Sequence, residues 1–477
     1  MKHLYLDQAL AEYKQKDYYP YHMPGHKGIS LSFPDPYAID ITEIENFDNL
    51  HEPVGILLES QKRASSLYGA KNSFYLVNGS TCGILSAISA CLPRKGTLLL
   101  GRNSHKSVFH ASFLRQLHLK YVMPEITDFG IQGSVNPDDV LTAIKKWPQI
   151  GAILITSPTY DGIVSDIKTI ASIAHQHHIP LIVDEAHGAH FHFSEQFPAQ
   201  ALELGADIVI HSLHKTLPSF TQTALLHVNS ERVNLERLKE FLSIYQTSSP
   251  SYLFMASMDR CIRFIENEGQ AKFELFYKRL TNFYSRCKTL RNIKVYQVHG
   301  NSPTCYDKDI SKIVISSGNN PSSGSKLYNI LLDKYHLQME MMSGHYVVAL
   351  LSVMDGEDGF TRLYNALDEI DQSFICEQMS DHTENYSSTK DFYPTPVQNL
   401  TITEAIESPS KEVSIADSLG KISKEYLYLY PPGIPLLVPG EMITSDLLCS
   451  ITKINQNRLK LHGLSDPLGL RINIVNS

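Results

Sequence analysis

The sequence lacks three features, and each absence excludes a class of protein. No apolar run approaches the roughly 20 residues of a membrane-spanning helix, and the first residues, Met1 to Asp7, lack the apolar core of a signal peptide. The seven cysteines never stand in CxxC spacing, which excludes a disulfide framework and a cysteine–zinc site and is typical of a reduced cytoplasm. The 42 Lys and Arg stand against 50 Asp and Glu, so we expect neither a nucleic-acid nor a membrane partner.

The composition that remains is that of an ordinary globular protein. The chain has 477 residues, of which 43% are apolar and 19% are charged. This length is enough for roughly two to four domains. The simplest class that fits is a cytoplasmic enzyme.

Short apolar runs alternate with helical segments between about residues 70 and 230. Five runs predict strands, at 73–77, 97–100, 151–156, 180–183 and 207–210. Their apolar residues are continuous, as in strands that are buried on both faces of a parallel sheet. The segment 165–178 carries apolar residues at helical spacing. This order predicts a doubly wound α/β fold with a mostly parallel sheet.

The pattern changes after the predicted sheet. We expect an N-terminal arm over 1–50, a major domain over 51–305 and a smaller α+β domain over 306–376. The smaller domain holds predicted strands at 312–316 and 346–351 and a helix at 326–335. Residues 377–396 are polar and rich in Ser, Thr, Asp and Pro, which predicts a linker before a C-terminal domain over 397–477.

Groups that bind a ligand should collect at the carboxyl ends of the parallel strands. The first strand runs into Gly79, Ser80 and Thr81 ahead of a helix at 84–91. Free N–H groups, two hydroxyls and the helix dipole favour a phosphate there, although a merely capped helix has the same pattern. After the next strand, His105 can stack on a planar ring or act as an acid, or it is an ordinary polar loop residue.

Two further strands lead to an acid and an amine. Asp184 follows three aliphatic residues, so its carboxylate needs a cation, either a protonated pyridine nitrogen or a neighbouring Lys or Arg. Lys215 can form a Schiff base with an aldehyde if its site lets it lose a proton, whereas most lysines are solvated surface charges. Ser212 and His214 flank Lys215, and each can reach a phosphate.

The combination of these groups predicts pyridoxal 5′-phosphate, because this cofactor presents a phosphate, a ring, a pyridine nitrogen and an aldehyde. A metal centre is the competing interpretation, since six histidines are close in the chain: His175, His177, His178, His187, His190 and His192. HExxH spacing is absent, and the first three lie at the polar end of a predicted helix. We therefore expect no catalytic metal.

Ordered motifs extend far beyond these strand ends. They are His22-Met23-Pro24-Gly25-His26-Lys27-Gly28, Asp40-Ile41-Thr42-Glu43, Asn78-Gly79-Ser80-Thr81, Arg102-Asn103-Ser104-His105-Lys106-Ser107, Ser157-Pro158-Thr159-Tyr160, Asp184-Glu185-Ala186-His187, Ser212-Leu213-His214-Lys215-Thr216-Leu217-Pro218, Tyr430-Pro431-Pro432-Gly433-Ile434-Pro435 and Pro439-Gly440-Glu441. On these motifs the sequence resembles the Orn/Lys/Arg decarboxylase family, in its short form without the N-terminal wing domain. The resemblance implies a fold-type I, aspartate aminotransferase-like major domain of seven-stranded type that binds pyridoxal phosphate.

The resemblance also implies roles by position. Lys215 is the implied Schiff-base lysine, Asp184 the partner of the pyridine nitrogen and His105 the residue stacked on the ring. The implied phosphate ligands are Gly79, Ser80, Thr81, Ser212 and His214. His187 would lie near the ring oxygen or the substrate carboxylate, and Glu441 would face the distal cation of the substrate. Two residues depart from the family pattern: Leu213 stands where a small hydroxyl residue is common, and Phe220 where a small residue is usual.

The activity implied is decarboxylation of a basic L-amino acid, with arginine favoured and agmatine and CO2 as products that feed polyamine synthesis. A homodimer with active sites at the subunit interface is implied as well. Lysine or ornithine, giving cadaverine or putrescine, stay open because the sequence contains no measure of the cavity's length. An aminotransferase is an alternative of another class, with Arg471 either clamping the substrate carboxylate or making a surface contact. A cofactor-sensing protein without catalysis would not need both Lys215 and Asp184.

Overall fold

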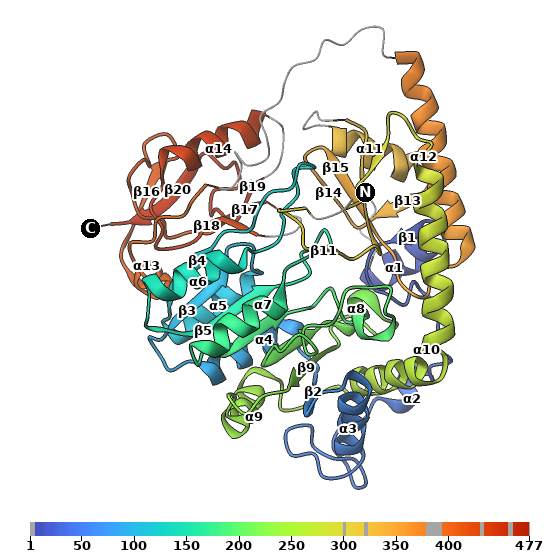
Figure 1. Cartoon of the computed structure of the whole chain (residues 1–477), viewed down its shortest axis with the longest axis horizontal. Helices are drawn as coiled ribbons and strands as arrows, with labels where there is room; N and C mark the ends of the chain where they lie inside the picture. Colours follow the sequence, from blue (N-terminus) through green and yellow to red (C-terminus); the bar gives the residue numbers. More distant parts are fainter. Residues whose placement is uncertain are drawn as a thin grey trace.

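A seven-stranded sheet forms the centre of the computed structural model, which describes residues 5–298, 302–318, 323–377, 394–429, 434–456 and 461–476 (Figure 1). The strand order is β2-β9-β8-β7-β5-β3-β4, and β9 runs antiparallel to both of its neighbours. The strands are β2 (Asn72–Leu76), β3 (Thr97–Gly101), β4 (His118–Val122), β5 (Ile150–Thr156), β7 (Leu181–Asp184), β8 (Ile208–His211) and β9 (Ala224–Val228). The predicted mostly parallel α/β sheet is confirmed.

Five of these strands coincide with the predicted apolar runs, whereas β4 and β9 were not predicted. β4 lies at the edge of the sheet and carries the polar residues His118 and Lys120, so it lacks the continuous apolar run of a central strand. β9 is interrupted by His227, whose buried ring has its Nδ1 2.7 Å from the Ser73 hydroxyl of β2. A polar residue that has a hydrogen-bonding partner on the neighbouring strand thus interrupts the apolar run by which a buried strand is predicted.

Alternate residues of the central strands pack against opposite helical layers. Leu98, Leu100 and Ile182 belong to a core shared with α4, α5 and α9, whereas Leu99 and Val183 belong to a core shared with α3, α6, α7 and α10. These helices are α3 (Ile56–Tyr68), α4 (Gly79–Cys91), α5 (Lys106–Arg115), α6 (Pro137–Lys146), α7 (Ile167–Gln176), α9 (Leu235–Tyr245) and α10 (Tyr252–Cys287). Both faces of the sheet are therefore buried from solvent, which is why its central strands are continuously apolar.

Two consecutive acids at the end of β7 face opposite sides of the sheet. Asp184 lines the same cavity as Ser80 at the start of α4. The Glu185 carboxylate instead lies 2.7 Å from His211 Nε2 and accepts the Ala201 N–H at 3.0 Å. Burial raises the pKa of the Glu185 carboxyl well above its usual range. Because successive side chains of a strand point to opposite faces, Asp184 faces the cavity and Glu185 faces the core.

A smaller antiparallel sheet follows the long helix α10. Its order is β10-β12-β15-β14, formed by β10 (Lys294–Val295), β12 (Lys312–Ser316), β15 (Tyr346–Leu350) and β14 (Met341–Ser343). Helix α11 (Ser323–Asp333) packs on this sheet, and α12 (Glu357–Glu377) runs beside α10 (Figure 1). The predicted elements at 312–316, 326–335 and 346–351 are confirmed as β12, α11 and β15.

The C-terminal part has a separate small core and lies beside the β3–β4 end of the large sheet (Figure 1). It contains α13 (Ile402–Glu407), α14 (Ser445–Gln456), β16 (Ser410–Ser414), β17 (Leu427–Leu429), β18 (Pro435–Leu437), β19 (Leu461–His462) and β20 (Arg471–Val475). Most of the predicted linker at 377–396 lies outside the described residues, and the domain boundaries stay a prediction. None of the described helices combines the length and apolar character needed to cross a bilayer.

The N-terminal segment formed by residues 19–28 contacts His214, which follows the large sheet, and Leu350 of the smaller sheet. Its strand β1 (Tyr19–Tyr21) pairs in parallel with β13 (Leu337–Met339), and the Gly25 N–H donates to the His214 carbonyl at 2.7 Å. A Cβ on Gly25 would lie 2.7 Å from the Leu217 carbonyl oxygen, so only glycine fits this close approach. Helices α1 (Leu6–Lys14) and α2 (Pro36–Ile39) flank this segment in the chain.

Candidate active site

A cavity of about 480 Å³ opens at the carboxyl edge of the large sheet. All the residues predicted to bind the cofactor line it: Gly79, Ser80, Thr81, His105, Asp184, His187, Ser212, His214 and Lys215. They come from the ends of β2, β3, β7 and β8, four strands that point the same way. The topology therefore brings together side chains that are up to 136 residues apart, from position 79 to position 215.

One end of the cavity is rich in hydrogen-bond donors. Helix α4 begins at Gly79, whose φ of +70° lets the chain turn sharply from β2 into the helix. The Ser80 and Ser212 hydroxyl oxygens lie 2.6 Å apart. His214 donates from Nδ1 to the Thr223 carbonyl at 2.8 Å, and burial lowers its pKa to about 4. Hydroxyls and a helix N-terminus form a cradle suited to a phosphate, whose negative charge would favour protonated His214 as a further donor.

Lys215, His187 and Asp184 form the chemical centre of the cavity. Lys215 lies on α8 (Leu213–Thr216), and its Nζ is 2.9 Å from His187 Nε2. Burial lowers the pKa of Lys215, while the charge of Asp184 opposes this shift. Burial and the Lys215 charge hold the pKa of His187 well below its usual range. A neutral imidazole therefore accepts a hydrogen bond from the Lys215 Nζ.

Asp184 is buried, with 4% of its surface exposed. Burial raises the pKa of its carboxyl, and Lys215 and the Ala186 N–H act in the opposite direction. A carboxylate in such a place needs a cation close by.

His105 forms another wall of the cavity and caps the start of α5. Its Nδ1 accepts from the Ser107 N–H at 3.3 Å and lies 2.9 Å from the Ser107 hydroxyl. Desolvation by its neighbours, together with the charge of Lys215, lowers the pKa of His105. The ring is thus neutral and available to stack on a planar ligand.

Several cavity residues escaped the sequence reasoning. Tyr160 stands in one of the quoted motifs without a role, and its ring centroid is 4.7 Å from that of His187. Glu340 comes from the turn between β13 and β14, far from any quoted motif, and Met23 comes from the N-terminal segment. The remaining such residues include Gln132, Thr156, Thr159, Asp161, His345 and Tyr346. The quoted motifs around Tyr160 and Met23 contained a usable signal, whereas Glu340 had none.

Glu441 lies outside the cavity lining, in a buried ion pair. Its Oε2 accepts from Arg102 Nη2 at 3.1 Å and from the Val438 N–H at 2.9 Å, and 1% of Glu441 is exposed. The carboxylate expected to meet the substrate's cation thus already has a cation in the chain, and its substrate role stays a prediction. Residues 430–433 of the same motif lie outside the described residues.

Glu441→Gln distinguishes these two roles. If Glu441 serves Arg102, the variant leaves a buried guanidinium without its counter-charge and loses on the order of 3 kcal/mol of stability, while KM stays unchanged. Thermal unfolding and steady-state kinetics measure both quantities. Glu412→Gln is the control, since Glu412 pairs with Arg471 at the surface, where pairs contribute about 0–1 kcal/mol. A raised KM with unchanged stability would instead return Glu441 to the substrate.

The residues that the aminotransferase and metal-centre alternatives require do not form such sites. Arg471 stands on β20 and pairs with Glu412 at 3.0 Å, its side chain 58% exposed, so it does not line the cavity. Three histidines of the metal interpretation pair with single carboxylates: His175 with Asp207, His190 with Asp309 and His192 with Glu203. Over the described ranges, no three His, Cys, Asp or Glu side chains are grouped to hold a metal ion.

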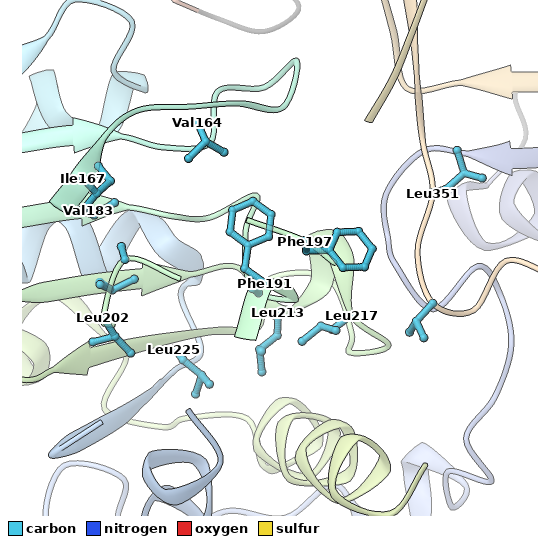
Figure 2. Close-up of a cluster of buried hydrophobic side chains, with 14 of the residues drawn as sticks. Val164, Ile167, Val183, Phe191, Phe197, Leu202, Leu213, Leu217, Leu225 and Leu351 are labelled. Atoms are coloured by element: carbon cyan, nitrogen blue, oxygen red, sulfur yellow. The ribbon is translucent and has the colours of Figure 1, made fainter. Parts of the chain in front are cut away.

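The two departures beside Lys215 have structural explanations. Leu213 is fully buried in the large core, and Figure 2 shows it beneath the α8 turn near Phe191 and Leu225. Phe220 packs edge-on against Phe33, with ring centroids 4.8 Å apart. Both residues therefore support the turn that carries Lys215 rather than line the cavity.

The sheet and the groups at its carboxyl edge have the architecture of fold-type I pyridoxal phosphate enzymes. The family model described as Orn/Lys/Arg decarboxylase, major domain, matches residues 5–313, and the C-terminal domain of the same family matches residues 381–458. The chain belongs to the Orn/Lys/Arg decarboxylase family and is a decarboxylase.

Relatives resemble the chain over nearly its full length. It is 33% identical to the uncharacterized protein YaaO of Bacillus subtilis (strain 168), over 96% of this chain and 95% of that protein. It is 29% identical to the arginine decarboxylase of the same organism, over 98% and 96%. Among solved structures, the Francisella novicida lysine decarboxylase LdcF shares the fold, with a TM-score of 0.76 and 19% identity over 90% of this chain and 73% of that chain.

Proposed function

We propose that this protein decarboxylates L-arginine to agmatine and CO2 with pyridoxal 5′-phosphate as its cofactor. The observation that carries the proposal is the 2.9 Å contact between Lys215 and His187 beside buried Asp184, in one cavity with a phosphate cradle. Lysine and ornithine, giving cadaverine and putrescine, are the alternative substrates.

The donor set of the cavity fits this cofactor. Ser80, Thr81, Ser212 and His214 would hold the phosphate at the start of α4, and neutral His105 would lie against the ring. Asp184 would pair with the pyridine nitrogen, which gives its buried carboxylate a cation. Lys215 is the amine for the aldehyde. When bound, the cofactor supplies a protonated ring that accepts the electron pair released as the Cα–carboxylate bond breaks.

The chain's own groups orient the substrate and move protons. Asp184 would present its carboxylate to the pyridine nitrogen, and this negative charge would favour the protonated form of that nitrogen. Lys215 Nζ donates to neutral His187 Nε2 across 2.9 Å, which positions the lysine to protonate Cα after CO2 leaves. Buried walls around these groups keep water away from the reacting bond.

Arginine is favoured over lysine by the comparisons. The relative named arginine decarboxylase is 29% identical over 98% of the chain, whereas the constitutive lysine decarboxylase of Escherichia coli (strain K12) is 23% identical over 93%. An aminotransferase would need an arginine that binds the substrate carboxylate. The candidate for this role, Arg471, instead pairs with Glu412 at the surface.

We also propose a homodimer in the cytoplasm. The segment after the N-terminal arm's first strand exposes large apolar side chains, which a monomer would leave in water: Ile29, Tyr37, Ile44, Phe47, Val54 and Ile56. Because Met23 of the same stretch of chain lines the cavity, pairing through these side chains would put the active sites near the subunit interface. We further propose that the chain is divided into the N-terminal arm, major domain, smaller domain, linker and C-terminal domain that the sequence predicts.

A substrate panel tests the proposed activity. Purified protein loaded with pyridoxal phosphate is offered L-arginine, L-lysine and L-ornithine separately, and CO2 and the amine are quantified. We expect agmatine from arginine with the highest kcat/KM. A keto acid product without CO2 would indicate transamination, and cadaverine or putrescine as the main product would replace arginine as the substrate.

A further inference from the structure

Three carboxylates line the cavity, and their surroundings differ. Asp184 lies beside Lys215, as described. Asp161 is 5% exposed, and burial raises its pKa to about 6, with Tyr346 and Lys308 as its nearest compensating groups. Glu340 is only partly buried and lies at the wall formed by the smaller sheet. Of the three, Glu340 is therefore the carboxylate that is both accessible and not yet assigned.

Glu340 is held rigidly by neutral donors. The Tyr160 hydroxyl donates to its Oε1, and the Met23 N–H donates to its Oε2 at 2.8 Å. Over the described parts of the chain, no Lys or Arg forms an ion pair with it. A carboxylate offers about four lone-pair positions, so one on each oxygen stays open. A guanidinium presents paired N–H groups that can occupy one open position on each oxygen.

The segment that supplies the Met23 N–H is itself fixed. Lys27 Nζ donates to the carbonyls of Pro20, His22 and Leu350 at 2.8–2.9 Å and lies 3.8 Å from Asp355. This ammonium fastens residues 19–28 to the end of β15. Lys27 attracts Glu340 electrostatically, but its ion pair is with Asp355, so Glu340 has no direct partner of opposite charge among the described residues.

The position of Glu340 suits the far end of a basic amino acid. Tyr160 lies between Glu340 and His187, and His187 contacts Lys215. The carboxylate thus lies one aromatic ring beyond the amine at which the substrate reacts. A substrate whose α-amino group replaces the Lys215 amine would extend its side chain along Tyr160 toward Glu340.

We infer that Glu340, held by Tyr160 and Met23, is the subsite that recognises the distal cation of the substrate, and that it pairs bidentately with a guanidinium. The inference rests on the proposed function, since it assigns the specificity of the same cavity. It places recognition on Glu340, in contrast to Glu441, whose carboxylate is paired with Arg102.

Agmatine binding tests the subsite without requiring turnover. Agmatine carries the guanidinium but no α-carboxylate, and its affinity for the cofactor-loaded enzyme is measured by titration calorimetry. Glu340→Gln should weaken it about 10- to 100-fold, the range of a lost charge-assisted hydrogen bond. Glu412→Gln, a matched change at the surface, should leave it unchanged. The neutral ureido analogue of agmatine should bind the wild type and Glu340→Gln equally.

A second measurement needs no variant, in case Glu340→Gln fails to fold or to retain the cofactor. The loaded wild-type enzyme is treated with a water-soluble carbodiimide and an amine, and labelled carboxylates are located by mass spectrometry. Agmatine should protect Glu340 and leave Glu412 labelled. Unchanged labelling of Glu340, or unchanged agmatine affinity in the Gln variant, overturns the subsite.

The two proposals fail in different ways. If the loaded wild type releases no CO2 from any basic amino acid, the proposed function is wrong. If it releases CO2 from arginine while Glu340→Gln binds agmatine normally, only the subsite assignment is wrong.

Discussion

Lys215→Ala should abolish turnover, with a loss of at least about 10⁴-fold, the size found when an enzyme loses its reactive nucleophile or base. The variant removes both the amine that would hold the cofactor's aldehyde and the partner of His187 Nε2. It should also release the cofactor on gel filtration, which absorbance follows directly. Lys168→Ala, at an exposed position of α7, is the matched control.

The alanine at position 215 should leave the fold intact. Leu213 and Leu217, which carry the packing of this turn (Figure 2), are unchanged. The cofactor-free variant should therefore still unfold in one cooperative thermal transition, although Asp184 loses the nearby charge of Lys215. Substantial turnover by a folded Lys215→Ala enzyme would remove Lys215 from the chemistry.

Asp184→Ala should lower turnover far more than it lowers cofactor occupancy. The carboxylate would stabilise a protonated pyridine nitrogen, and loss of one such electrostatic group costs on the order of 10²–10³-fold in rate. The phosphate cradle at Ser80 and Ser212 is untouched, so the variant should still load with cofactor. Single-turnover kinetics on the fully loaded variant measure the rate separately from occupancy.

An isosteric variant separates charge from shape. Asp184→Asn keeps the side-chain size and removes the charge, so it should lose nearly as much rate as the alanine variant. If either fully loaded variant turned over at the wild-type rate, Asp184 would have no part in the electron-sink role.

The strand ends were predictable because each lies beside a continuous apolar run. Once five runs predict parallel strands, their carboxyl ends must meet at one edge, and this brings Ser80, His105, Asp184 and Lys215 together without any structure. Their roles toward the cofactor stay predictions. The antiparallel strand β9 was hidden because buried His227 breaks its apolar pattern.

Contacts between distant parts of the chain were not predictable from local pattern. The family resemblance implied a substrate role for Glu441, and local pattern could not show its buried partner Arg102, which lies 339 residues away in the sequence. Glu340 follows the three-residue strand β13, which has no apolar run by which it could be predicted. The pairing of β13 with β1 places Glu340 at the cavity. Both depend on packing between separate units, which a single sequence does not record.

The neighbouring acids at the end of β7 make this strand intolerant of insertions and deletions. Because side chains alternate across the sheet, removing one residue within Leu181–Asp184 would shift each acid to the position before it. Glu185 would then enter the cavity with a longer side chain, and Asp184 would take the place of Val183 in the apolar core. Related chains can therefore vary in length in the surrounding loops, whereas the residue count along this strand has to stay constant.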